Sequence, residues 1–193
     1  TAERTALNLL GHLSGVATAT SQWADAIAST SAKVRDTRKT TPGMRALEKY
    51  AVRCGGGVNH RMSLSDAALV KDNHIVAAGG VASAFAAVRK AAPAIVLEIE
   101  VDTIDQLRTA LTAGADLVLL DNMKPEVLCE AVAIASQHLA STGRAVVLEA
   151  SGGLTLENAQ SVAATGVNYI SVGALTHSAK VLDIGLDLET IVA

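Results

Sequence analysis

The sequence contains very few aromatic residues. Trp23, Tyr50, Phe85 and Tyr169 make up 2% of its 193 residues. Proteins that bind single-stranded nucleic acid stack bases on aromatic side chains, so this scarcity argues against nucleic acid as a partner. Half of the residues are hydrophobic and 18% are charged, which is typical of a globular chain. The core must therefore be built mainly from Ala, Val, Leu and Ile, and the length suits one domain.

Several other features are missing. The two cysteines, Cys54 and Cys129, cannot form a disulfide scaffold and lack the spacing of zinc ligands, which favours a reducing cytoplasm. No run of 18 uncharged apolar residues exists, so we expect no membrane span. The chain shows no signal peptide and opens on Thr1 without an initiator Met. We therefore expect its natural N-terminus to be missing.

Charge is unevenly distributed along the chain. The formal net charge is −3, yet residues 33–71 carry nine Lys or Arg and only three acids. Residues 72–193 carry fourteen acids against six bases. A strongly basic segment inside an acidic chain suggests a site for anions, although a solvated basic face would give the same pattern.

Strand and helix patterns alternate along the chain. Short apolar runs predict strands over 32–35, 66–70, 94–101, 116–120, 145–150 and 168–172. Helices are expected over 3–30, from Pro42 to 53, and over 81–91, 103–113, 125–139 and 155–165. This order predicts an α/β fold, an incomplete (βα) barrel with about six parallel strands. A doubly wound open sheet is the alternative, although no GxGxxG motif follows the first strand.

Each predicted strand runs into polar or small residues. Active sites of parallel α/β proteins lie at the C-terminal ends of the strands, so we expect these residues to form one site. The early strands supply cations, which bind carboxylates and phosphates, and the later strands supply acids and glycine-rich loops suited to sugars, Mg²⁺ and phosphate. The substrates should therefore be polyanionic. The residues are Arg38, Lys39, His60, Arg61, Lys71, Glu100, Asp121, Ser151, Gly152, Gly153, Gly173 and Ala174.

Less specific interpretations remain open for some of these residues. Lys71 could be an ordinary surface lysine, and a histidine such as His60 is often only structural. Glu98 lies two residues before Glu100 and so shares its face of the strand, where it could be a salt-bridge partner.

The string RDTRKTTPGMRALEKYAVRCGGGVNHRMSLSDAALVKDNHI, over residues 35–75, resembles quinolinate phosphoribosyltransferase. The resemblance covers nearly the whole chain, and the motifs DTRKT, GGGVNHR and KDNH are together specific. It implies an incomplete α/β barrel preceded by an α/β sandwich domain, which is missing here. We accordingly expect a helical junction over 1–30, the catalytic barrel over 31–178, and a tail over 179–193 that packs on the missing domain.

The resemblance also implies a reaction. In this family, quinolinate and phosphoribosyl pyrophosphate give nicotinate mononucleotide, pyrophosphate and CO₂, with Mg²⁺, in NAD biosynthesis. The family works as a homodimer in which one subunit completes the other's active site. Two alternatives are a related type II phosphoribosyltransferase that uses nicotinate or another acceptor, and a barrel that binds sugar phosphates without turnover.

The resemblance assigns roles to single residues. It implies that Arg38, His60, Arg61 and Lys71 bind quinolinate, with Lys39 and Thr40 beside them, and that Arg4 reaches the site across the dimer interface. Glu100 and Asp121 would act on the ribose and hold the metal, with Lys39 as a third catalytic residue. The 5′-phosphate cradle would be formed by Ser151, Gly152, Gly153, Gly173 and Ala174.

Overall fold

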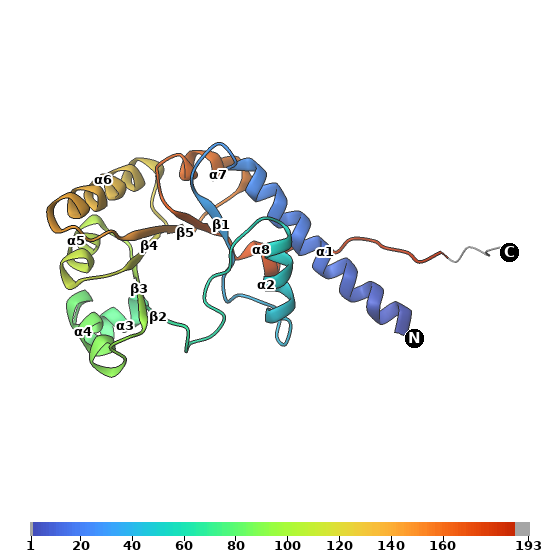
Figure 1. Ribbon diagram of the computed structural model, residues 1–193, viewed down its shortest axis with the longest axis horizontal. Helices are drawn as coiled ribbons and strands as arrows, with labels where there is room; N and C mark the ends of the chain where they lie inside the picture. The colour runs from blue at the N-terminus through green and yellow to red at the C-terminus, as the bar shows by residue number, and fades with distance from the viewer. Residues whose placement is uncertain (1, 188–193) are drawn as a thin grey trace.

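The computed structural model describes residues 2–187, in which strands and helices alternate (Figure 1). The strands are β1 (Lys33–Arg35), β2 (Ala67–Val70), β3 (Val96–Val101), β4 (Leu117–Asp121), β5 (Val147–Ser151) and β6 (Tyr169–Ser171). The helices are α1 (Ala2–Ala26), α2 (Arg45–Cys54), α3 (Asp72–Ala78), α4 (Val81–Ala91), α5 (Ile104–Ala113), α6 (Pro125–Thr142), α7 (Leu156–Ala163) and α8 (Ala174–His177). None of the helices within this range is both long and apolar enough to span a bilayer.

The strands form one parallel sheet in the order β1-β6-β5-β4-β3-β2. Neighbours in the sheet are therefore neighbours in sequence, except where β1 lies beside β6. This is the order of a (βα) barrel opened between β1 and β2, and helices α4 to α7 flank the curved sheet on its outer side (Figure 1). The predicted incomplete barrel is confirmed. In a doubly wound sheet the strand order reverses at a point within the sheet, and the order found here has no such reversal, so that alternative is excluded.

The two faces of the sheet differ in polarity. On β3, Leu97 and Ile99 are fully buried in the hydrophobic core under the helices. Glu98 and Glu100 alternate with them and so point to the other face. Leu119 pairs with Glu100 on one side and with Glu149 on the other, which places these side chains on the same inner face. The inside of this open barrel is thus largely polar, unlike the apolar filling of a closed barrel.

The opening between β1 and β2 is partly covered by the segment that follows α2. Val58 forms a parallel bridge with Arg35 on the free edge of β1. Its amide donates to the carbonyl of Val34, and its carbonyl accepts from the amide of Asp36. Within the described chain no strand pairing joins β1 directly to β2.

Helix α1 packs against α2, α7 and α8, and it also supports the C-terminal segment. A Cβ atom at Gly15 would lie 2.0 Å from the carbonyl oxygen of Lys180, and one at Gly11 would lie 2.6 Å from that of Leu182. The amide of Leu182 donates to the carbonyl of Gly11 at 3.1 Å. The first residues of the expected tail therefore lie directly on α1. Residues 188–193 are outside the described range, and packing of the tail on a further domain stays a prediction.

Two helix boundaries were wrong, and one helix was not predicted. The helix expected from Pro42 begins only at Arg45, because Gly43 has a positive φ of 78° that a helix cannot contain. The helix expected to reach residue 30 ends at Ala26. Helix α3 was not predicted, since it is one short run between Lys71 and a left-handed Gly79, without the usual Ser, Thr or Asp cap.

Candidate active site

A cavity of about 410 Å³ opens at the C-terminal ends of the strands. It contains many of the residues expected from the sequence: Arg38, Lys39, His60, Arg61, Lys71, Glu100, Asp121 and Ser151. Its remaining walls are Thr37, Leu69, Leu119, Glu149 and Ser171. The basic segment and the acidic half of the chain therefore meet in one place.

The cationic wall is built from the loop after β1 and the segment before β2. Arg61 donates through one terminal nitrogen to the carbonyl of Ala67 at 2.7 Å. Among residues 2–187, the Nε atoms of Arg38 and Arg61 are buried and have no hydrogen-bond partner. Burial, and then the nearby Arg38, lower the pKa of the Arg61 guanidinium. Two crowded guanidinium groups with unused donors form a site that an anion would stabilise.

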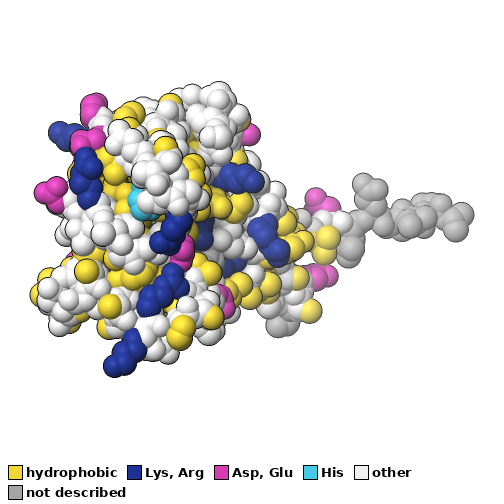
Figure 2. Space-filling model, turned by 60° about the vertical axis from the view of Figure 1, so that its left-hand side comes forward, with side chains coloured by type: hydrophobic (Ala, Val, Ile, Leu, Met, Phe, Trp, Pro, Cys, Tyr) yellow, Lys and Arg dark blue, Asp and Glu magenta, His cyan; other side chains and the backbone are white. Residues whose placement is uncertain are grey.

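Lysine and arginine side chains are also prominent on the outer surface. Figure 2 shows them scattered in a broken band over one face, with a few acidic side chains between them. A basic surface of this kind raises the local concentration of anionic ligands.

The acidic wall consists of Glu100 on β3 and Asp121 at the end of β4. Lys71 Nζ lies 2.5 Å from Glu100 Oε2, so the two walls touch here. Burial raises the pKa of the Asp121 carboxyl, and the negative charges of Glu100 and Asp102 raise it further. Carboxylates that repel each other in this way are relieved by a divalent cation, and carboxylate oxygens are the ligands that Mg²⁺ prefers. The residues present therefore fit a magnesium ion.

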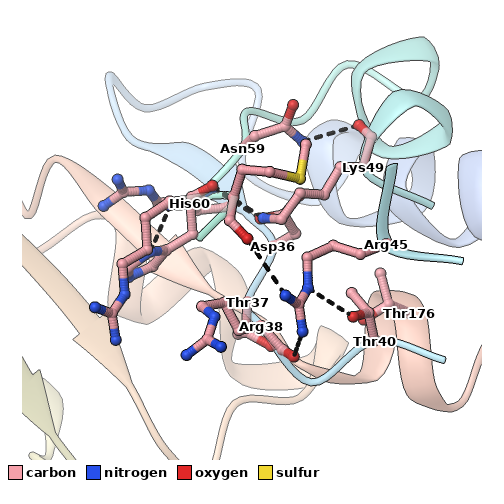
Figure 3. Close-up of polar contacts among 12 residues, drawn as sticks. Asp36, Thr37, Arg38, Thr40, Arg45, Lys49, Asn59, His60 and Thr176 are labelled. Atoms are coloured by element: carbon pink, nitrogen blue, oxygen red, sulfur yellow. Dashed lines mark hydrogen bonds and ion pairs between the residues drawn. The ribbon is translucent and has the colours of Figure 1, made fainter. Parts of the chain in front are cut away.

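A buried ion pair supports the cationic wall from behind (Figure 3). Asp36, directly after β1, is paired with Lys49 of α2, and both are almost completely buried. The Asp36 carboxylate also accepts from Asn59 Nδ2 at 2.6 Å and from the amide of His60 at 2.7 Å. Lys49 Nζ donates to the carbonyl of His60 at 2.9 Å, although burial lowers its pKa. This pair fixes the segment that carries Arg61 to the strand that leads into Arg38.

The loop after β1 is held from two further sides. Arg45 donates through Nε to Thr40 Oγ1 at 3.0 Å and through a terminal nitrogen to the carbonyl of Arg38 at 3.3 Å (Figure 3). Thr176 Oγ1, in α8, donates to the carbonyl of Lys39 at 2.8 Å. Thr40 thus supports the loop by its contact with Arg45 and is not among the residues that line the cavity.

The glycine-rich loops border the main cavity. Gly152 and Gly153 line a smaller adjoining cavity of about 200 Å³, which shares Ser151 with the larger one. Gly152 has a φ of 84°, and a Cβ there would lie 3.0 Å from the amide nitrogen of Asn122, so the backbones approach closely. The N-terminus of α7 follows, beginning at Leu156 after the cap residue Thr155. This loop has the features of an anion cradle.

The other predicted residues lie at different distances from the cavity. A Cβ at Gly173 would lie 3.3 Å from Lys39 Cδ, so this loop touches the cationic wall, and Ala174 is the first residue of α8. Arg4 lies in the first turn of α1, where it lines a separate small cavity with Leu182. The described chain therefore does not bring Arg4 to its own cavity.

Sequence reasoning left several important residues unassigned. The Glu149 carboxylate is paired with Arg35 and accepts from Ser171 Oγ at 2.5 Å. Burial raises its pKa, and the neighbouring Glu98 raises it further. Glu149 lies two residues before Ser151, so the period of two along a strand was a signal that both share the inner face. The partnership of Asp36 and Lys49 had no such local signal.

Comparisons with known proteins identify the family to which this chain belongs. Residues 16–187 match the family described as Quinolinate phosphoribosyl transferase, C-terminal domain. The chain is 56% identical to a nicotinate-nucleotide pyrophosphorylase [carboxylating] of Mycobacterium leprae, with 97% of this chain and 65% of the relative covered. It is 43% identical to the human protein of that name, with 96% of this chain and 62% of the relative covered.

A solved structure gives the same result. The nicotinate-nucleotide pyrophosphorylase of Francisella tularensis superposes with a TM-score of 0.88 at 46% identity, over 94% of this chain and 62% of that one. The chain thus spans less than two thirds of the length of these relatives. The resemblance seen in the sequence is confirmed: the chain belongs to the quinolinate phosphoribosyl transferase family and carries its C-terminal domain.

Proposed function

We propose that the protein transfers a phosphoribosyl group from phosphoribosyl pyrophosphate to quinolinate, giving nicotinate mononucleotide, pyrophosphate and CO₂ in NAD biosynthesis. The observation that carries this proposal is that one cavity holds two kinds of group. Arg38 and Arg61 contribute buried Nε donors without hydrogen-bond partners, and Glu100 and Asp121 contribute carboxylates. The relatives named above support the same activity. A dicarboxylate matches two guanidinium groups better than a monocarboxylate such as nicotinate does.

The cationic wall binds and orients quinolinate. Arg38 and Arg61 take its two carboxylates, and Lys71 adds a third positive charge at the boundary with the acidic wall. This placement points the pyridine nitrogen toward the ribose. Because both reactants are held in orientation, a bimolecular step becomes effectively unimolecular.

The acidic wall acts on the ribose. As the bond from C1′ to the pyrophosphate oxygen breaks, the sugar becomes positively charged, and the carboxylates of Glu100 and Asp121 stabilise that charge. Lys39 stabilises the departing pyrophosphate, while the pyridine nitrogen forms the new bond to C1′. The resulting pyridinium ring accepts the electron pair left when the neighbouring carboxylate departs as CO₂. A proton from solvent then takes its place on that ring carbon.

Mg²⁺ belongs to this proposal as a cofactor held by Glu100 and Asp121. When bound, it supplies charge neutralisation for the pyrophosphate. The 5′-phosphate would lie on the loops that contain Ser151, Gly152, Gly153, Gly173 and Ala174, where backbone amides and the start of α7 favour an anion.

The proposal extends to assembly and location. We propose a cytoplasmic homodimer in which Arg4 of one subunit reaches the active site of the other, since Arg4 lies away from its own cavity. Because the chain spans less than two thirds of the length of its relatives, we expect the 193 residues alone to be poorly active in comparison with a chain of the relatives' full length. Equal activity of the two would contradict this part of the proposal.

The decisive experiment assays the complete gene product with phosphoribosyl pyrophosphate and either quinolinate or nicotinate. We expect release of pyrophosphate and CO₂ with quinolinate only. Arg61→Ala should reduce kcat/KM for quinolinate more than tenfold, because a charged two-pronged contact contributes at least about 2 kcal/mol. Arg108→Ala, an exposed arginine on α5, is the matched control. Binding of phosphoribosyl pyrophosphate without release of pyrophosphate would instead favour a barrel without turnover.

A further inference from the structure

The ring of His60 lies at the wall of the cavity and is largely buried. The residue is 7% exposed. Its Nδ1 accepts a hydrogen bond from the backbone N–H of Arg61 at 2.7 Å. Its Nε2 lies 3.1 Å from Glu98 Oε2 and 3.6 Å from Glu149 Oε1. Both ring nitrogens thus face groups of the protein itself.

These contacts define where the ring proton resides. An Nδ1 that accepts a backbone N–H carries no proton, so the proton of the neutral ring is on Nε2. That proton faces a carboxylate, which is the partner that stabilises this tautomer. These contacts connect three residues, from Glu98 through the ring of His60 to the backbone of Arg61.

We propose that Glu98 is a positioning residue for quinolinate binding: it fixes the Nε2–H tautomer of His60, and that tautomer in turn holds the Arg61 amide and so aims the Arg61 guanidinium into the cavity. This inference rests on the proposed function, because it takes quinolinate as the ligand whose binding depends on the orientation of the Arg61 guanidinium. In this role His60 acts through Arg61.

The backbone of His60 leaves only the ring free to vary. Its amide donates to Asp36 and its carbonyl accepts from Lys49, both of which are buried. With the backbone held in this way, rotation of the ring decides whether Nδ1 can accept from the next amide. Glu98 is therefore the group that sets the ring.

Glu98 is better placed for this role than Glu149. The Glu149 carboxylate is already engaged by Arg35 and Ser171. Glu98 is 2% exposed, and within the described chain its Oε1 has no hydrogen-bond partner. Its contact with His60 is also the shorter of the two.

The side chains of His60, Glu98 and Glu149 also resemble a metal site, because one ligand atom from each lies within 4.8 Å of the others. Coordination through Nε2 would move the ring proton to Nδ1. Nδ1 could then no longer accept from Arg61, and the observed 2.7 Å contact would be lost. The geometry therefore favours the positioning role, and metal binding is an outcome of the test.

The test uses the complete gene product and needs no variant for its first part. Nitrogen-15 NMR of the His60 ring, assigned by comparison with His60→Ala, should show the proton on Nε2. A proton on Nδ1, or a shift of the ring signals on addition of micromolar Zn²⁺ alone, would overturn the proposal.

Two variants give the second part. Glu98→Gln keeps an oxygen that can accept from Nε2, and we expect it to retain the tautomer and a quinolinate KM within about threefold of wild type. Glu98→Leu removes the acceptor, and we expect a mixture of tautomers and a rise of roughly tenfold in quinolinate KM, with the KM for phosphoribosyl pyrophosphate within about twofold. An unchanged tautomer and KM in Glu98→Leu would refute the link. If no form of the protein turns over quinolinate, the proposed function fails, while the NMR result still decides the role of Glu98 in setting His60.

Discussion

Lys71 Nζ lies 2.5 Å from Glu100 Oε2, and this contact joins the cationic wall of the cavity to the acidic wall. The Lys71 side chain is about half exposed, at 48%, whereas that of Glu100 is 13% exposed. The residue proposed to bind quinolinate is thereby tied to the residue proposed to act on the ribose.

This contact predicts that the two residues are energetically coupled. In a double-mutant cycle of Lys71→Met and Glu100→Gln, we expect the effects on kcat/KM to be non-additive by about 0.5–1 kcal/mol, a modest value because Lys71 is half exposed. Steady-state kinetics of the four proteins measures the coupling. Strict additivity would mean that the pair does not form in the working enzyme.

The buried carboxyl of Glu149 predicts a pH-dependent stability. Its pKa is raised in the folded protein, so the folded state holds this proton more tightly than the unfolded chain does. The resulting stabilisation is present below the unfolded pKa of about 4.3 and is lost as the pH rises through the folded pKa. Relative to Glu149→Gln, wild type should therefore lose stability as the pH rises from 4 toward neutrality.

Urea unfolding of both proteins across this pH range measures the difference. Glu130→Gln, which changes an exposed glutamate on α6, is the control and should show no comparable trend. A free energy difference between wild type and Glu149→Gln that stays constant with pH would show that Glu149 titrates as it does in the unfolded chain.

Lys49 and Asp36 predict a large loss of stability. In Lys49→Met, Asp36 remains buried without its cationic partner, and we expect the free energy of unfolding to fall by about 3–5 kcal/mol. Lys33→Met, at an exposed lysine of β1, should change it by less than about 0.5 kcal/mol. Denaturant unfolding measures the free energy of unfolding of both variants. Equal losses would show that the buried pair stabilises the protein no more than an exposed lysine does.

Gly15 predicts that docking of the C-terminal segment is sensitive to a single methyl group. In Gly15→Ala the new Cβ would collide with the Lys180 carbonyl, so we expect a loss of about 1–3 kcal/mol and faster proteolysis near residues 180–182. Gly185→Ala is the matched control, because a Cβ there meets no atom of the described chain within 4 Å. Similar protease resistance in both variants would contradict the contact.

Much of this architecture was predictable because its signals are local. Runs such as 116–120 and 145–150 identify their own strands, and the rule for parallel sheets then places Asp121 and Ser151 at one end. The pairing of Asp36 with Lys49 was not predictable, because it depends on how α2 packs against the end of β1. Burial of a lysine is also rare enough that no sequence pattern favours it.

The glycines of α1 show the same limit. In the sequence, Gly11 and Gly15 indicate a weak point of a helix. In the structure the helix is continuous, and the two residues make room for the backbone of residues 180–182. The reason for their small size lies some 170 residues away in the chain.

The opening between β1 and β2 has a consequence for the mechanics of the barrel. On one side the covering segment is bonded to the edge of β1 through Val58, and on the other it reaches β2 through the Arg61 guanidinium and the carbonyl of Ala67. A dicarboxylate bound by both Arg38 and Arg61 would connect the loop after β1 to this covering segment. The bound substrate would then stabilise the part of the barrel that no strand pairing closes. Amide hydrogen exchange in residues 55–70 should therefore slow when quinolinate binds.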